Sequence, residues 1–379
     1  MVLNEEQQMI REMAHRFAAE RIRPFSRSWE VDASMPADIL AEMGELGFLG
    51  MTVPENQGGA GLDYVSYVLA LMEIAAGDGA LSTIMSVNNA PVCEILLNHG
   101  SPEQQERFLA PLARGEMIGA FALSEPQAGT DAANLRSRAE RDGDRYRING
   151  TKQFITSGRI AGAVIVFAVT DPAKGKKGIT AFVVPRDTAG MSVTRIEEKL
   201  GQTASDTAQL DFGDAEVDVA LRIGEEGEGY RIALSNLETG RIGIAAQSVG
   251  MAQAALDAAV RYTDERESFG RRLRDHQAVA FRLADMATEV EVARAAVLRA
   301  AALKDAGQPC LKEACIAKLF ASEAAERICS AALQCLGGYG YTRDFPVEKI
   351  YRDVRVCQIY EGTSDVQRML IARSLGSGG

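Results

Sequence analysis

The pattern of apolar residues divides the chain into three stretches and limits its architecture more than any other feature. In residues 1–120 apolar side chains recur at spacings of three and four, for example over 10–17, which is the period of an amphipathic helix. Residues 121–230 instead carry short segments rich in β-branched and aromatic residues between Gly, Asp and Asn. The helical spacing returns over 231–379, where long helices with short loops indicate an antiparallel bundle. The order α, β, α therefore predicts an α+β chain with a helical N-terminal domain, a central β domain and a C-terminal helical domain.

Short cap and turn signals predict where several elements end. Residues 101–104 (SPEQ) combine a Ser cap, Pro at the first helical position and Gln three residues after the cap. Residues 142–144 (DGD) and 149–150 (NG) predict tight turns. The glycines at 337–338 predict a helix stop, and 364–367 (SDVQ) predict a capping box that starts a further helix.

Charge and hydropathy exclude several classes of protein. Lys and Arg number 41 against 52 Asp and Glu, a net charge of −11, so we expect no nucleic-acid partner, because phosphate binding needs a basic surface. The longest apolar run, about 161–169, is far shorter than the roughly 18 residues of a membrane-spanning helix. Residues 1–10 carry acids and glutamines where a secretory signal has a basic start and an apolar stretch. We expect a soluble protein without a membrane span.

Cysteine and histidine usage argues against a metal site. The six cysteines never form a Cys-x-x-Cys pair, and the three histidines are isolated from one another in the sequence. Structural zinc sites show tighter ligand spacing, so we expect buried reduced thiols and no bound metal. The cysteines are Cys93, Cys310, Cys315, Cys329, Cys335 and Cys357.

No Gly-x-Gly-x-x-Gly or Walker-type phosphate loop occurs, so a nucleotide cofactor would have to be held in another way. Three segments, 121–131, 149–158 and 334–373, are unusually dense in small, polar and aromatic residues. The first two could bind a phosphate or wall a flat ring, or could simply be an interdomain loop and hairpin packing. In the third, Glu361 lies in a predicted loop before a helix. It is a candidate general base if desolvated, or else an acid that stabilises the helix N-terminus.

Taken together, these segments resemble the acyl-CoA dehydrogenase family over essentially the whole chain. The matching motifs occur in the family's order and spacing: ALSEPQAGTD, NGTKQFITSG, GRIGIAAQSVGMAQAALD, RESFG, DHQA, QCLGGYGY and IYEGTSDVQR. The resemblance implies a C-terminal four-helix bundle, bound FAD, and α,β-dehydrogenation of an acyl-CoA thioester to the trans-2-enoyl-CoA. It implies that Glu361 removes the α-proton while the β-hydrogen leaves as hydride to flavin N5. It also implies that the Glu361 amide helps to polarise the thioester carbonyl.

The resemblance also implies further site residues. Some relatives carry the base at the position of Gly240 instead, and Glu238 lies two residues from that pattern. The residues implied to contact substrate are Thr130, Glu238, Arg241, Gly362 and Arg373. Those implied to lie along the isoalloxazine and pyrophosphate of FAD are Phe121, Leu123, Ser124, Gly129, Thr130, Phe154, Ile155 and Thr156. Thr363 and Asp365 are implied to lie beside its adenosine-diphosphate portion. Those implied to reach FAD in a neighbouring subunit are Arg266, Phe269, Gln277, Gln334, Gly337 and Gly338.

This sharing between subunits implies a homo-oligomer, usually a tetramer in the family, and the resemblance implies an electron-transfer flavoprotein as electron acceptor. The runs LETGRIGIAAQSVGMAQAALD and RDFPVEKIYRD resemble the short-chain and short/branched-chain members of the family, which implies short straight or short branched acyl groups. We expect a cytoplasmic location, or the mitochondrial matrix in a eukaryote. An acyl-CoA oxidase, a flavin monooxygenase and a non-catalytic acyl-CoA-binding protein stay open as alternatives.

Overall fold

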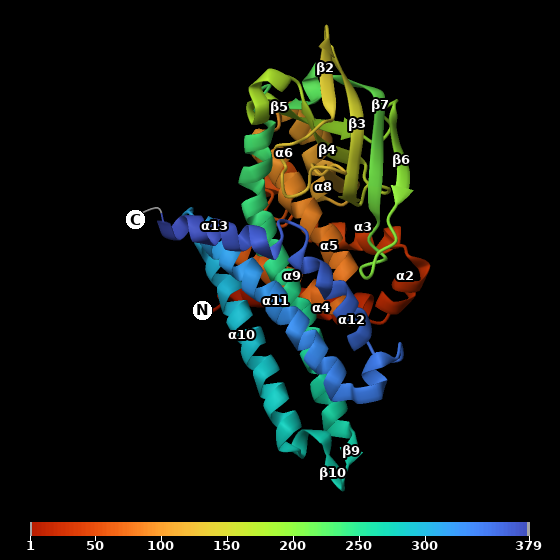
Figure 1. Ribbon diagram of the computed structural model, residues 1–379, viewed down its shortest axis with the longest axis vertical. Helices are drawn as coiled ribbons and strands as arrows, with labels where there is room; N and C mark the ends of the chain where they lie inside the picture. The colour runs from red at the N-terminus through yellow and green to blue at the C-terminus, as the bar shows by residue number, and fades with distance from the viewer. Residues whose placement is uncertain (1, 377–379) are drawn as a thin grey trace.

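The computed structural model describes residues 2–376 and places a mostly antiparallel sheet at one end of the molecule, beside the helices that precede and follow it in the chain (Figure 1). Ser101 caps Pro102–Gln104 with the predicted reciprocal bonds to Gln104, so that start signal is confirmed. The N-terminal helices are α1 (Glu5–Phe17), α2 (Ser26–Asp32), α3 (Ala37–Glu45), α4 (Tyr64–Gly77), α5 (Gly79–Val87), α6 (Glu94–His99), α7 (Pro102–Gln104) and α8 (Ala110–Ala113).

The sheet has the order β6-β7-β3-β2-β4-β5-β8, and β1 pairs in parallel with β4. The alternate side chains of β4 enter two different cores. Ile165 and Phe167 pack with the N-terminal helices, whereas Val164 and Val166 pack between the strands. Burial on both faces explains why this strand is a continuous apolar run. The strands are β1 (Gly119–Ala122), β2 (Arg138–Asp142), β3 (Arg145–Thr156), β4 (Ala163–Val169), β5 (Ile179–Pro185), β6 (Met191–Ile196), β7 (Thr207–Asp218) and β8 (Arg222–Ile223).

One predicted turn is wrong. The 142–144 signal does join β2 to β3, but Asn149 and Gly150 lie inside β3, where the register against β7 shifts. The Asn149 side chain bonds to both the backbone and the carboxylate of Asp214, which has a left-handed φ of 52°. An Asn-Gly pair here forms an irregularity that bends the long strand, because a cross-strand partner takes the bonds that a turn would have made.

The C-terminal helices form a bundle against α4 and the sheet. The 37-residue α9 (Gly229–Glu265) is the longest and runs from the sheet to the far end of the molecule (Figure 1). Gly337, with a φ of 59°, ends α11 as predicted. The other elements are β9 (Glu267–Ser268), β10 (Arg271–Arg272), α10 (Gln277–Asp305), α11 (Leu311–Leu336), α12 (Val347–Val354) and α13 (Ser364–Gly376).

Within residues 2–376, one helical stretch is long and apolar enough to span a membrane by length and composition. This stretch, Gly79–His99, comprises α5, the π-helical segment Asn88–Cys93 with a kink at Ala90, and α6, and 89% of its apolar window is buried inside the protein. The high hydropathy of this stretch is therefore explained by its burial in the core of the protein. The six cysteines are also buried, and none forms a disulfide in the described chain, in agreement with the sequence prediction.

Candidate active site

Glu361 lies in the short loop that precedes α13, and its backbone has a left-handed φ of 54°. The helix starts one residue earlier than the predicted capping box requires. Thr363 accepts from the amide of Val366 at 3.3 Å and its carbonyl accepts from Gln367, so Thr363 is the cap and Ser364 the first helical residue. The loop that carries Glu361 is therefore only a few residues long and closely constrained.

Two buried side chains hold the residue that follows Glu361. The ammonium of Lys318, on α11, donates to the Gly362 carbonyl at 2.7 Å, and the Gln367 amide donates to the same oxygen at 2.9 Å. Gly362 itself has a φ of 88°, which favours glycine. The sequence analysis missed Lys318, because a lysine in an amphipathic helix is normally exposed to solvent. Its burial could have been predicted only from its position on the same face of α11 as several buried alanines.

The Glu361 carboxylate is poised to exchange a proton near neutral pH. Its Oε2 atom is buried, and nothing in residues 2–376 hydrogen-bonds to it. Burial raises the pKa of Glu361 to about 7, against the opposing charges of Arg241 and Lys318. A carboxylate with that pKa is half ionised at neutral pH and suits general base catalysis.

Helix α9 leaves room for this carboxylate at Gly240. A Cβ atom built there would lie 2.8 Å from Glu361 Oε2, so any side chain would displace the carboxylate. The next residue, Arg241, is 6% exposed, and its Nε has no partner in the described chain. Glu238 instead accepts from the Cys310 thiol at 3.2 Å. The structure thus brings Glu361, Gly240 and Arg241 together, while Glu238 is engaged with a different partner.

A second group of predicted residues meets at the sheet. The backbone N–H of Gln153 donates to the backbone carbonyl of Ser124 at 2.9 Å, which joins the 121–131 segment to β3. The register of β3 against β7 shifts between Lys152 and Ile155, and Phe154, inside this bulge, has a φ of 60°. A bulge re-aims a side chain, and the Phe154 ring is 66% exposed. Around it Leu123 and Ile155 are buried, Phe121, Ser124 and Thr156 half-buried, and Gly129 and Thr130 exposed.

A buried ion pair that the sequence analysis missed holds this loop. The Lys152 ammonium lies 2.7 Å from Glu125 Oε1, with both side chains essentially unexposed. Glu125 also accepts from the amides of Arg136 and Ser137. Burial alone would raise the pKa of Glu125, but Lys152 and these hydrogen bonds outweigh it and lower the pKa to about 2. Glu125 is therefore a buried carboxylate that ties both ends of the loop together.

We expect Lys152→Met to weaken cofactor binding at this loop. The substitution leaves the Glu125 charge buried without its cation, which typically costs about 3–5 kcal/mol. The loop should loosen, and the fraction of purified protein with bound flavin should fall, as measured by the ratio of visible to 280 nm absorbance. Lys174→Met, which removes an exposed ion pair with Asp171 in another loop of the same sheet, is the control. Equal flavin content in both variants would contradict this role.

Six of the remaining predicted cofactor residues lie at the end of the molecule opposite the sheet that carries Phe154. Arg266, Phe269 and Gln277 are exposed around the β9–β10 ribbon, at the opposite end of the long axis from the sheet (Figure 1). The Phe269 ring is 96% exposed. The exposed Gln334, Gly337 and Gly338 lie at the same end, where Tyr339 contacts Tyr262 of α9 with 6.2 Å between ring centroids. Thr363 and the exposed Asp365 start α13, and Arg373 lies exposed in its last turn.

Comparison with known proteins covers nearly the whole chain. Three family models match consecutive parts of the chain. They are the N-terminal domain of acyl-CoA dehydrogenase over residues 4–116, its middle domain over 120–215 and its C-terminal domain over 227–376. The chain belongs to the acyl-CoA dehydrogenase family. The mitochondrial short-chain specific acyl-CoA dehydrogenase of Bos taurus is 46% identical over 373 residues, which are 98% of this chain and 90% of that protein.

Solved structures agree with this family assignment. Butyryl-CoA dehydrogenase from Megasphaera elsdenii superposes with a TM-score of 0.96 at 40% identity, over 99% of each chain. A chain in the structure described as the electron transferring flavoprotein of Acidaminococcus fermentans superposes with a TM-score of 0.98 at 43% identity, over the full length of both chains. This member of the acyl-CoA dehydrogenase family is an FAD-dependent oxidoreductase of acyl-CoA thioesters.

The residues at the sheet fit this cofactor. The exposed Phe154 ring offers one wall for a flat isoalloxazine. At Gly129 a Cβ atom would meet nothing within 4 Å, so the backbone there is open to a ligand. The Oε2 atom of Glu361 is buried and has no hydrogen-bond partner in the described chain, which suits a group that accepts a proton.

Proposed function

We propose that this acyl-CoA dehydrogenase oxidises short acyl-CoA thioesters, with Glu361 as the base that removes the α-proton. The observation that carries the proposal is the buried Glu361 carboxylate, held beside Gly240 and Arg241 with its pKa raised to about 7. An α-proton is a very weak acid, so the thioester oxygen must be stabilised as charge develops, and the Glu361 amide is the proposed donor from this chain. FAD, when bound, accepts the β-hydrogen as hydride.

Polar groups one helical turn from the base support a short acyl chain. A Cβ atom on Gly243 would lie 2.8 Å from Ser86 Oγ and 3.2 Å from the Tyr67 hydroxyl, which has no hydrogen-bond partner in the described residues. Nearby, Glu94 accepts from Thr239 at 3.0 Å and is buried. A long alkyl chain packed against these buried groups could not supply the hydrogen-bond partner that the Tyr67 hydroxyl lacks, which is costly. The names of the short-chain relatives point the same way.

An anaerobic titration of the purified protein tests this proposal. We expect butyryl-CoA to bleach the visible flavin band at least tenfold faster than an octanoyl thioester, with isobutyryl-CoA separating straight from branched substrates. Faster bleaching by octanoyl-CoA would contradict the short-chain assignment. Peroxide formation at the rate of turnover in air would favour an oxidase, and a flavin that no acyl-CoA bleaches would favour a monooxygenase or a binding protein.

Assembly, partner and domain boundaries belong to the same proposal. The exposed residues at the far end of the bundle support FAD sites shared between subunits of a homotetramer, and Phe269, at 96% exposure, is the main observation. We propose an electron-transfer flavoprotein as the acceptor, supported by the structural match to a chain in the structure described as the electron transferring flavoprotein of Acidaminococcus fermentans. The domains 1–120, 121–230 and 231–379 are supported by the start of β1 at Gly119 and of α9 at Gly229. We propose a bacterial cytoplasmic or mitochondrial matrix location, supported by one relative from Bacillus subtilis and another named as mitochondrial.

A further inference from the structure

Tyr360, the residue before Glu361, is anchored by a buried glutamine on α9. The Tyr360 hydroxyl lies in hydrogen-bond contact with Gln247 Oε1. The amide nitrogen of Gln247 contacts the Gly79 carbonyl at 2.9 Å and Ser82 Oγ at 2.8 Å. A carbonyl can only accept, so the nitrogen must face Gly79 and the oxygen must face Tyr360. The direction of the contact is therefore determined, and Tyr360 donates.

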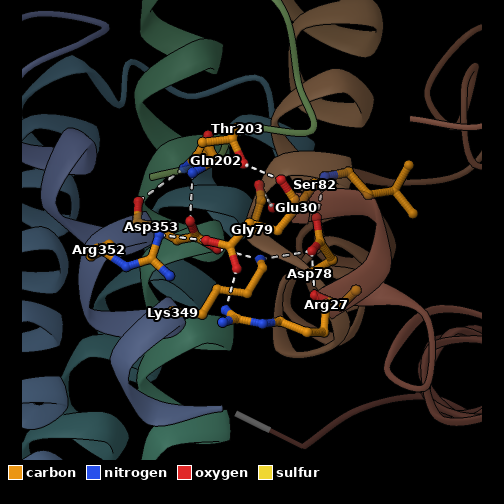
Figure 2. A network of polar contacts seen from close by, with 12 residues as sticks. Arg27, Glu30, Asp78, Gly79, Ser82, Gln202, Thr203, Lys349, Arg352 and Asp353 are labelled. Atoms are coloured by element: carbon orange, nitrogen blue, oxygen red, sulfur yellow. Dashed lines mark hydrogen bonds and ion pairs between the residues drawn. The ribbon is translucent and has the colours of Figure 1, made fainter. Parts of the chain in front are cut away.

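The glutamine is in turn held by a chain of buried polar groups. Thr83 Oγ1 lies 2.5 Å from the Gln247 amide and donates to Gln202 Oε1 at 2.6 Å. Gln202 donates from its backbone and its side chain to Asp353, which pairs with Lys349 at 2.6 Å. Figure 2 shows Gln202, Asp353, Lys349 and Asp78 converging from the β6–β7 loop, α12 and the α4–α5 junction. Gln247 is thus fixed by three parts of the chain that are distant in sequence.

This chain of contacts acts on a strained residue. A non-glycine residue at positive φ costs roughly 1–2 kcal/mol and persists only where its surroundings hold it. Lys318 and Gln367 hold Glu361 from the Gly362 side, and the Tyr360 hydroxyl is the anchor on the other side. Without that anchor, the loop is free to relax the backbone of Glu361 and to turn its carboxylate and its amide away.

We propose that Gln247 is a positioning residue for the reaction, which acts through the Tyr360 hydroxyl to hold Glu361 in its strained, buried conformation. The inference rests on the proposed role of Glu361 and adds a residue that lies on a different helix. Gln247 differs from a purely structural glutamine because its oxygen accepts from the Tyr360 hydroxyl next to the base, and also from the Cys357 thiol at 4.0 Å, while its nitrogen makes the structural bonds.

Steady-state and anaerobic kinetics of Tyr360→Phe, Gln247→Met and the double variant test the inference. We expect each single variant to lower kcat and the bleaching rate about tenfold with KM within twofold, because a small displacement of a reacting group is costly. The kcat of the double variant should match that of the single variants rather than fall about a hundredfold, since both substitutions remove the same interaction. The midpoint of the pH–rate profile should fall by about one unit as Glu361 becomes more solvated.

Gln104→Met is the matched control. Gln104 is also buried and donates to two carbonyls, those of Ala220 and Arg222, but it holds α7 against the sheet. We expect it to lower stability without changing kcat or the pH midpoint. If Gln247→Met does not fold, Tyr360→Phe still tests the positioning role, because it removes only the hydroxyl oxygen. Wild-type kcat in Tyr360→Phe beside an inactive Glu361→Gln overturns the positioning role alone, whereas an active Glu361→Gln overturns the base assignment and this inference with it.

Discussion

Glu361→Gln should lower the rate of flavin bleaching by about 10²–10⁴-fold while FAD content and acyl-CoA affinity stay near those of the unmodified protein. General base catalysis contributes about this factor, and the amide cannot accept the α-proton. Glutamine has the same shape as glutamate, so it still fits in the space that Gly240 leaves. That space is narrow, because a Cβ atom added to Gly240 would lie 2.8 Å from the Glu361 carboxylate. Stopped-flow bleaching with saturating butyryl-CoA measures the rate, and binding isotherms measure the affinity.

The pH dependence of the unmodified protein is the companion measurement. Burial raises the pKa of Glu361 to about 7 against the opposing charges of Arg241 and Lys318, and burial together with the charges of Glu94 and Glu361 raises the pKa of the Tyr67 hydroxyl. The base must be ionised, so the bleaching rate should rise through pH 7 and level off above it. A rate in Glu361→Gln within about tenfold of the unmodified protein would move the base elsewhere, and Glu238 would be the first residue to test.

The same substitution should make the fold more stable at alkaline pH. A carboxyl group whose pKa is raised by folding stabilises the protein below its unfolded pKa, and this contribution is lost as pH rises through the folded value of about 7. Glutamine carries no charge to bury, so Glu361→Gln should gain up to about 3 kcal/mol at pH 8. Unfolding curves at pH 5 and pH 8 therefore separate a loss of the base from a loss of the fold.

Lys349→Met should have the largest effect on stability. The Lys349 ammonium lies 2.9 Å from Asp78 and 2.6 Å from Asp353, and all three side chains are nearly unexposed (Figure 2). Burial would lower the pKa of Lys349, but the two carboxylates outweigh it and raise the pKa above its usual value. Removing the cation leaves two buried acids facing each other, which typically costs about 3–5 kcal/mol. Chemical denaturation at pH 8 measures this free energy.

An exposed ion pair provides the control. Arg327→Met removes a contact with Glu289 across the outer faces of α10 and α11 and should cost less than about 1 kcal/mol. Protonation of Asp78 or Asp353 relieves their repulsion, so the deficit of Lys349→Met should be smaller at pH 5 than at pH 8. A deficit that stays below 1 kcal/mol at both pH values would show that the acids find other partners.

The order of the elements and the chemistry of the site follow from local signals in the sequence. Apolar spacing separates helical from strand segments because each period places side chains on one face. The Ser101 cap and the Gly337 stop act within one helical turn, and the structure confirms both. The acyl-CoA dehydrogenase motifs pointed to Glu361 before its surroundings were visible. The turn predicted from Asn149 and Gly150 was wrong, because the Asn149 side chain bonds to Asp214 on the neighbouring strand and both residues lie inside β3.

Tertiary structure decided the properties that make Glu361 a candidate base. Its raised pKa depends on burial against α9, and its conformation depends on contacts from Lys318 and Gln247, each remote in sequence. The Glu125–Lys152 and Lys349–Asp78 pairs are equally invisible in the sequence, because charged residues usually stay in water. The burial of a side chain and its pairing with an opposite charge depend on many neighbours that only the folded chain brings together. The sequence therefore shows which residue types are present, but not how strongly burial and pairing stabilise them or shift their pKa values.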